Sequence, residues 1–335
     1  MVNLHQTEQN IISQLFDSSI FTSSETAGMA QAKLEMIQAM RRPQTVKRIS
    51  SFLTDLVGRA PYVFLENMVW LVGEQATLSV DQTRVLLATM KAVINEPNVQ
   101  SANADHLVAR VPIIRQVHSV VSNLDERAIE SIIDGLLVDR FGLLTKEKVT
   151  VPENERNVVV DAYWSVSHDF TNITQALVNW LKQAQRPAPL SAVQQVNRAL
   201  LARPFISPAT APDLWPALQT HKEEIAALWW ATGRYVLECG DAYAVLLDRK
   251  RLPSTSKQYI TALGVALSLG AGLPEAELGK RIRQVGKQYY ENIKTLNPTM
   301  VKDALFEFAL AYRHGKTILP TALVDRVIVK QEEAQ

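Results

Sequence analysis

Glycine, cysteine and long apolar stretches are all scarce in this chain of 335 residues. The 13 glycines make up about 4% of the chain, roughly half of the usual ~7%. Glycine most readily supplies the positive φ angles that tight hairpin turns require. The shortage therefore argues against an all-β fold and favours a protein built mostly of helices.

The single cysteine, Cys239, excludes an intramolecular disulfide and a cysteine-rich zinc site. We interpret it as a small core residue rather than a reactive thiol. The first ten residues lack the charged and apolar regions of a signal peptide, and no run approaches ~20 apolar residues. We therefore expect a cytoplasmic protein without a membrane partner.

Charge is balanced overall but uneven along the chain. The 35 Lys and Arg against 34 Asp and Glu exclude a polycationic protein. Residues 249–335, however, hold 14 of the cations and only 8 of the acids. The sequence thus predicts a basic C-terminal quarter.

Apolar residues recur at spacings of three and four almost throughout, which predicts amphipathic helices. Pro43 and Pro61 each suit the first turn of a helix, and Gly58 and Gly73 suit the ends of these two helices. A further helix is expected over 241–249. The predicted fold class is mainly α, as a multi-helix array or a two-lobed helical bundle. Its expected parts are an N-terminal helical domain, a hairpin with helices and a proline-rich linker, and a basic C-terminal helical domain, over residues 1–145, 146–216 and 217–335.

The pattern changes to alternation near 144–161, where Lys148-Val-Thr-Val151 and Asn157-Val-Val-Val-Asp161 flank a turn-like Pro152-Glu-Asn-Glu155. Two short strands joined by that turn form a hairpin, the one β signal that we find in the sequence. A helix that begins at Pro152 is the alternative.

The helix predicted over 125–139, followed by this hairpin, resembles the last helix and wing of a winged-helix domain. The helix carries Asp125, Glu126, Glu130 and Asp134, with Arg127 as the one cation before Arg140. Acidic residues beside phosphates would be repelled. The resemblance therefore implies a unit that contacts protein rather than DNA, and an ordinary surface helix with a surface hairpin is the alternative.

A helix predicted over 274–296 separates an apolar stripe from a row of cations. With cations of the next predicted helix, this row forms a candidate phosphate-binding face, beside which Tyr290 and Tyr312 could stack on bases. The alternative is the ordinary wet face of an amphipathic helix. The candidate nucleic-acid-binding residues are Lys280, Arg283, Lys287, Lys294, Lys302 and Arg313.

Catalytic signatures are missing from the sequence. It has no P-loop, no dinucleotide-binding glycine motif and no metal-binding histidine pair. His168, which precedes Asp169, is interpreted as a capping or packing residue rather than a general base. We predict no metal, no cofactor and no enzyme, although a pocket that gathers His168 with carboxylates would favour one.

Trp229 and Trp230 are adjacent, so they cannot face the same side of a helix. We expect one of them at an interface, because exposed tryptophans commonly anchor interfaces. The first hypothesis is a non-catalytic helical subunit of a larger assembly, with protein partners or a homo-oligomer. The second is a nucleic-acid-binding protein that binds RNA or DNA without sequence preference.

Overall fold

The computed structural model describes residues 3–26, 28–72, 78–101, 105–153, 156–183, 189–203, 205–250, 256–290, 292 and 295–326, and for 148–153 and 156–161 the backbone alone. The chain is mainly α, with small antiparallel sheets of three strands each. It divides into two compact units, Met1–Arg198 with Ala227–Arg234, and Ala199–Ala226 with Tyr235–Gln335. Independent folding of the three segments expected from the sequence stays a prediction.

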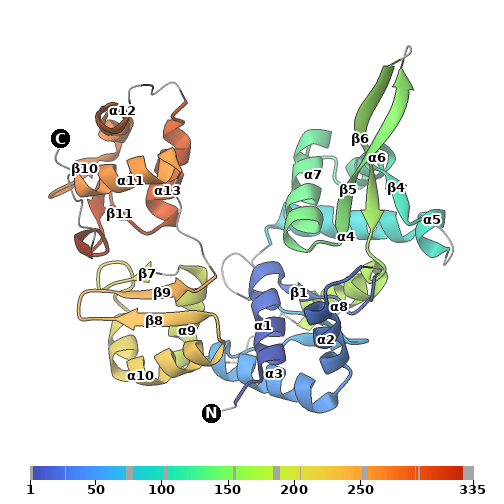
Figure 1. The fold of residues 1–335 in the computed structure, drawn as a ribbon, viewed down its shortest axis with the longest axis horizontal. Coiled ribbons are helices and arrows are strands. Elements are labelled where there is room, and N and C mark those ends of the chain that lie inside the picture. Colours follow the sequence, from blue (N-terminus) through green and yellow to red (C-terminus); the bar gives the residue numbers. More distant parts are fainter. Residues whose placement is uncertain are drawn as a thin grey trace. The chain divides into compact units, whose positions relative to one another are not determined.

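A similar order of elements occurs four times along the described chain (Figure 1). A helix is followed by a short strand, two further helices and a two-stranded hairpin. The second set adds a one-turn helix before the short strand, and the third has one divided helix in place of two. In every case the second hairpin strand lies in the middle of the sheet, between the first hairpin strand and the short strand. We call each such set a repeat, and the helix that precedes its hairpin the third helix.

The first repeat has a two-residue hairpin turn, in which Leu65 and Glu66 have positive φ angles of 46° and 66°. Its sheet is covered by α8 (Phe170–Gln183), whose Asn179 donates to the Tyr62 hydroxyl at 3.0 Å. The elements are α1 (Gln6–Ser18), β1 (Ile20–Phe21), α2 (Gln31–Met40), α3 (Pro43–Val57), β2 (Tyr62–Phe64) and β3 (Asn67–Val69).

The second repeat confirms the predicted hairpin and excludes the alternative helix at Pro152. The hairpin is long, and Figure 1 shows it extending beyond β4, which pairs with residues 163–165 of β6. A π-helical turn, Asp134–Arg140, continues the third helix. The elements are α4 (Val80–Ile94), α5 (Pro97–Gln100), β4 (Leu107–Ala109), α6 (Arg110–Val120), α7 (Glu126–Ile133), β5 (Leu144–Glu153) and β6 (Arg156–Val166).

The third repeat contains one long helix where the others have two. Non-helical backbone angles at His221 divide this helix into two segments. The elements are α9 (Ala192–Ala202), β7 (Phe205–Ile206), α10 (Trp215–Ala231), β8 (Tyr235–Cys239) and β9 (Ala244–Asp248).

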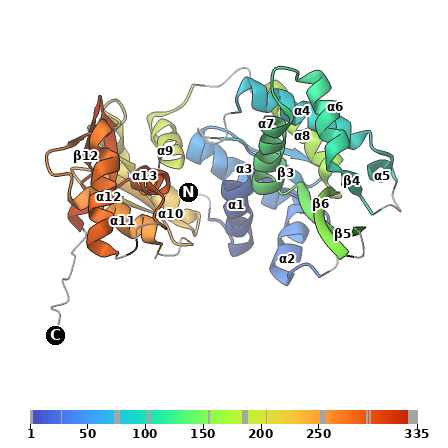
Figure 2. The same ribbon diagram turned by 90° about the horizontal axis from the view of Figure 1, so that it is seen from above.

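The fourth repeat packs three helices around one apolar core, and both views show them gathered beside the small sheet (Figures 1 and 2). Gly264 allows this packing, because a Cβ there would lie 2.5 Å from the Tyr289 ring. The elements are α11 (Lys257–Leu267), β10 (Leu273–Pro274), α12 (Leu278–Tyr289), α13 (Pro298–Glu307), β11 (Ala311–His314) and β12 (Thr317–Pro320).

Two predicted helices were wrong, the one expected to begin at Pro61 and the one expected over 241–249. The predicted hairpin is therefore one of several β features. Residues 62–69 form the hairpin β2–β3, and residues 244–248 form strand β9. Strands of three to five residues are too short for their periodicity to be told from a helical turn. The scarcity of glycine did not prevent the first hairpin, because Leu65 and Glu66 adopt the positive φ angles themselves.

Candidate functional site

The cationic row expected on the helix near 274–296 exists on α12. Lys280, Arg283 and Lys287 are exposed, whereas Leu278, Ile282 and Val285 on the opposite face are buried. Within the part of the chain that the structure describes, these three cations form no ion pair. Their charges are therefore available to a partner.

The other predicted cations are placed differently. Lys302 and Arg313 both contact the Glu275 carboxylate, at 3.0 and 3.3 Å. Hydrogen bonds from Lys302 and Arg313 hold the pKa of the Glu275 carboxyl below its ordinary value. These two cations are thus engaged within the fourth repeat, and Lys294 lies outside the described residues.

The adjacent tryptophans of α10 face opposite ways. Trp229 is fully buried, and its indole nitrogen donates to the side-chain oxygen of Asn197 at 2.8 Å. It therefore offers no surface to a partner. Trp230 is 58% exposed, and its role at an interface stays a prediction.

Cys239 is half-buried at the end of β8 rather than in a core. Burial raises the pKa of its thiol above the ordinary value. A raised pKa disfavours the thiolate, which is the nucleophilic form of cysteine.

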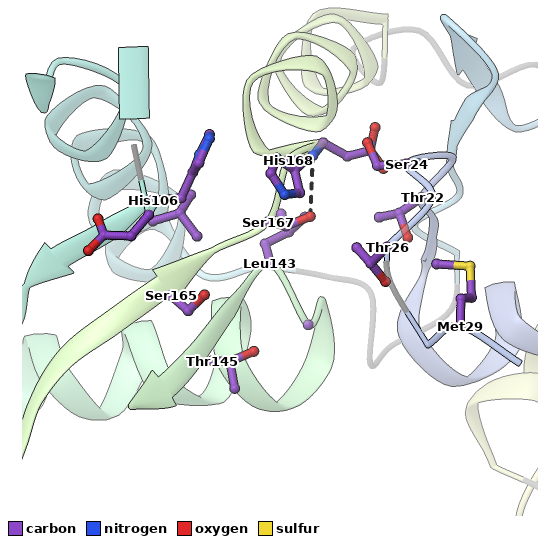
Figure 3. A pocket seen from close by; sticks show the side chains of 14 residues that line it. Thr22, Ser24, Thr26, Met29, His106, Leu143, Thr145, Ser165, Ser167 and His168 are labelled. Atoms are coloured by element: carbon purple, nitrogen blue, oxygen red, sulfur yellow. Dashed lines mark hydrogen bonds between the residues drawn. The ribbon is translucent and has the colours of Figure 1, made fainter. Parts of the chain in front are cut away.

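The sequence analysis missed a polar pocket of about 490 Å³ in the first unit (Figure 3). Thr22, Ser24, Thr26 and Met29, which follow β1, form one side of it, and the ends of the second repeat's strands form the other. Six hydroxyl side chains face the pocket, with two imidazoles, two carboxylates and no Lys or Arg. The polar lining residues are Thr22, Ser24, Thr26, Thr145, Ser165, Ser167, His106, His168, Asp105 and Asp169.

Strand pairing brings the two histidines of this pocket together. The Val166 amide donates to the His106 carbonyl at 2.9 Å, and the rings of His106 and His168 lie 4.6 Å apart, edge to face. His106 has a φ of 53°, an uncommon value for a residue other than glycine. Its Nδ1 atom is buried and has no hydrogen-bond partner among the described residues. Because 62 positions separate the two histidines, only knowledge of the β4–β6 pairing would have related them.

Asp169 connects two segments of the first unit. Its side chain is 2% exposed and accepts a hydrogen bond from the Ser24 amide at 2.6 Å, which joins the loop after β1 to the start of α8. In the described part of the pocket, no hydrogen bond connects an imidazole to a hydroxyl, although acyl transfer uses such a pair. No group of three metal-binding side chains occurs among the described residues. The pocket can therefore hold a polar ligand, and it lacks an assembled nucleophile.

Comparisons with known proteins leave the chain without an assigned relative: no family model, no curated protein and no solved structure matches it. No described helix combines the length and the apolar character that crossing a membrane requires.

Proposed function

We propose that each of the four repeats is a winged-helix-like domain. What supports this is the shared order of elements, a helix–strand–helix–helix–hairpin chain, and the shared position of the second hairpin strand at the centre of the sheet. The second and third helices correspond to a helix-turn-helix pair, and the hairpin corresponds to the wing. The acidic unit at 124–161 is then one member of a tandem array.

We further propose that the chain is a non-catalytic subunit of a macromolecular assembly and that it binds proteins through these domains. One observation carries this proposal: three of the four third helices are net negative. A helix that enters a DNA groove lies among phosphates, where acidic residues are repelled. The negative helices are α7 with its π-helical continuation, residues 222–231 of α10, and α13.

A cytoplasmic location belongs to the same proposal. It is supported by the single cysteine, because intracellular proteins seldom depend on disulfides. Catalysis, if present, would be sought in the pocket of Figure 3. If the protein turned over a substrate and His168→Ala abolished that turnover, the proposal of a non-catalytic subunit would be overturned.

The test is what the full chain binds. The tagged protein is captured from its native source at moderate salt, and the mass of the purified protein is measured by light scattering after size exclusion. We expect stoichiometric protein partners or a homo-oligomer. A strictly monomeric protein that captures nothing would overturn the proposal.

Nucleic-acid binding is the second candidate, favoured by the exposed row Lys280, Arg283 and Lys287. Reversal of all three charges should lower the affinity for single-stranded RNA and reduce the salt dependence of binding. The matched control reverses three exposed lysines elsewhere, Lys91, Lys182 and Lys222. Equal affinity of both variants, measured by fluorescence anisotropy, would eliminate this candidate.

A further inference from the structure

Two arginines of the first unit lie half-buried at the end of α3 without a carboxylate beside them. Arg59 follows the last residue of α3, and Arg198 lies on α9. Among the described residues, no Asp or Glu forms an ion pair with either side chain. We propose that this arginine pair binds one anionic side chain of a protein partner, through carboxylate or phosphate oxygens.

Arg59 is fixed through both its backbone and its side chain. Its carbonyl accepts a hydrogen bond from the Trp70 indole nitrogen at 3.0 Å. The central carbon of its guanidinium group lies 3.5 Å from the centroid of the Trp180 ring, and Trp180 is 3% exposed. A guanidinium stacked on an aromatic face keeps its N–H donors at the edge, where they can bind an acceptor. Arg59 therefore has its donors oriented before a ligand arrives.

Arg198 reaches the same place because α9 packs on the end of α3. Its Nε atom donates to the Val57 carbonyl at 2.7 Å, and Val57 is two positions before Arg59. Gly58 allows this close packing, since a Cβ at this position would collide with the Leu190 side chain. The Nε bond leaves the two terminal nitrogens of Arg198 without a described acceptor. Both guanidinium groups can thus donate to one anion.

The positive charges of the pair are not balanced within the described part of the first unit. Burial lowers the pKa of both guanidinium groups, and the proximity of Arg198 lowers that of Arg59 further. Arginine nevertheless stays charged at neutral pH. The carbonyl end of α3 supplies roughly half of a negative charge, which offsets only part of two positive ones. Because charged groups are seldom removed from water without a partner, an external anion would stabilise this arrangement.

One anionic group suits the arginine pair better than a nucleic acid does. A nucleic-acid backbone needs a longer row of cations, since its phosphates follow one another closely. Here the pair supplies two charges, and the exposed acid Asp55 lies in the last turn of α3. Two guanidinium groups match the oxygens of one carboxylate or phosphate, and arginine clusters recognise acidic motifs in this way. The inference rests on the proposed assembly role and gives the chemistry of one contact.

The first test measures anion binding by the full chain. Thermal unfolding is followed while inorganic phosphate is added, against sodium chloride at equal ionic strength. Phosphate should raise the Tm of the wild type, because a ligand of the folded chain stabilises it. The double variant Arg59→Gln and Arg198→Gln should lose this increment, with the apparent Kd for phosphate rising about tenfold or more. Each protein is compared with itself without phosphate, so a change in basal stability does not affect the result.

Two further variants serve as references for this titration. Arg59→Lys keeps the charge and loses the planar fork of donors, so its increment should be intermediate. Lys182→Gln removes an exposed charge from α8, the helix that carries Trp180, and should keep the whole increment. An increment of equal size in the wild type and the double variant would overturn the site. A loss in Lys182→Gln as large as in the double variant would do the same.

The second test determines whether a protein partner occupies the site. Tagged wild type, double variant and Lys182→Gln each capture proteins from the native source, and the double variant alone should lose a partner. Phosphatase treatment of the extract distinguishes the two anions, since it removes the partner only if a phosphorylated side chain is bound.

Unchanged capture by the double variant would overturn the inference and leave the assembly role standing. Loss of RNA affinity with unchanged protein capture would assign the pair to nucleic acid and overturn it as well. A wild type that captures nothing would overturn the assembly role, and the phosphate titration would still decide whether the arginines bind an anion.

Discussion

The first and second repeats share one order of elements, yet they invert the sign of a central ion pair. In the first repeat the buried member is an acid: Glu8 of α1 is 2% exposed and contacts Arg48 of α3 at 2.7 Å. In the second repeat the buried member is a cation: the Arg110 side chain of α6 is 10% exposed and contacts Glu130 of α7.

This inversion explains part of the difference between the two third helices. In both repeats the third helix supplies the more exposed partner, so its charge is opposite to that of the buried residue. The α3 helix therefore carries Arg48, together with exposed Lys47, and α7 carries Glu130, together with exposed Glu126. A shared topology thus leaves the charge of the third helix free to differ.

The largest effect is expected from Arg48→Ala. This change leaves the Glu8 carboxylate buried without its cation, and breaking such a pair from one side should lower the free energy of unfolding by about 3 kcal/mol. Urea unfolding measures the loss. Lys47→Ala, one position earlier and exposed, is the control and should change stability by less than about 0.5 kcal/mol. Equal effects of the two variants would show that Glu8 does not depend on Arg48.

A smaller loss, about 1–2 kcal/mol, is expected from Glu130→Ala in the second repeat. Arg110 keeps two other favourable neighbours, since Asp134 lies 3.9 Å away and the Trp164 ring centroid 5.3 Å away. The control is Glu126→Ala on the same helix, and the measurement is again urea unfolding. A loss as large as that of Arg48→Ala would contradict the contrast between the repeats.

The first two repeats also differ in the hydrogen bonding of a buried tryptophan. Trp70 donates from its indole nitrogen to the Arg59 carbonyl at 3.0 Å, whereas the Trp164 nitrogen has no hydrogen-bond partner among the described residues. Replacement by Phe creates a similar cavity at both sites, but only Trp70→Phe loses a hydrogen bond. Its stability loss should exceed that of Trp164→Phe by about 1 kcal/mol. Equal losses in thermal unfolding would refute this assignment.

The helical part of the fold could be predicted because most helices show long periodic patterns and recognisable ends. Ser79 caps α4 through the Gln82 amide, and Pro43 begins α3. The short strands could not be predicted. In the first hairpin, the two-residue turn is Leu65-Glu66, which lacks the Asn-Gly or Asp-Gly that normally marks such a turn, and its sequence also suits a helix.

The candidate surfaces were predictable to different degrees. The row Lys280, Arg283 and Lys287 follows from helical spacing alone, because residues on one helix have a fixed angular separation. The engagement of Lys302 and Arg313 with Glu275 depends on how α13 and β11 pack, which spacing does not reveal. The pocket of His106 and His168 depends on strand pairing between distant segments. The features that could not be predicted, the ion pairs of Glu275 and the histidine pocket, are therefore those that depend on packing between distant segments.

The smallest net effect is expected from Lys33→Met in the first repeat, because removal of the buried amine also removes its hydrogen bond to the Gln14 Oε1 atom at 2.8 Å. Burial lowers the pKa of Lys33 from 10.5 to about 8, against the attraction of Asp169. Between pH 8 and pH 10.5 the Lys33 amine is neutral in the folded chain and still protonated in the unfolded chain. The free energy of unfolding should therefore rise with pH over this range. The stability of Lys33→Met relative to the wild type should therefore fall between pH 7 and pH 10.

Exposed Lys91 provides the control, since Lys91→Met should shift stability equally at both values. Urea unfolding of the three proteins at each pH measures the difference. Alkaline pH should thus stabilise the first repeat. A Lys33→Met profile parallel to that of the wild type would place the Lys33 amine in solvent.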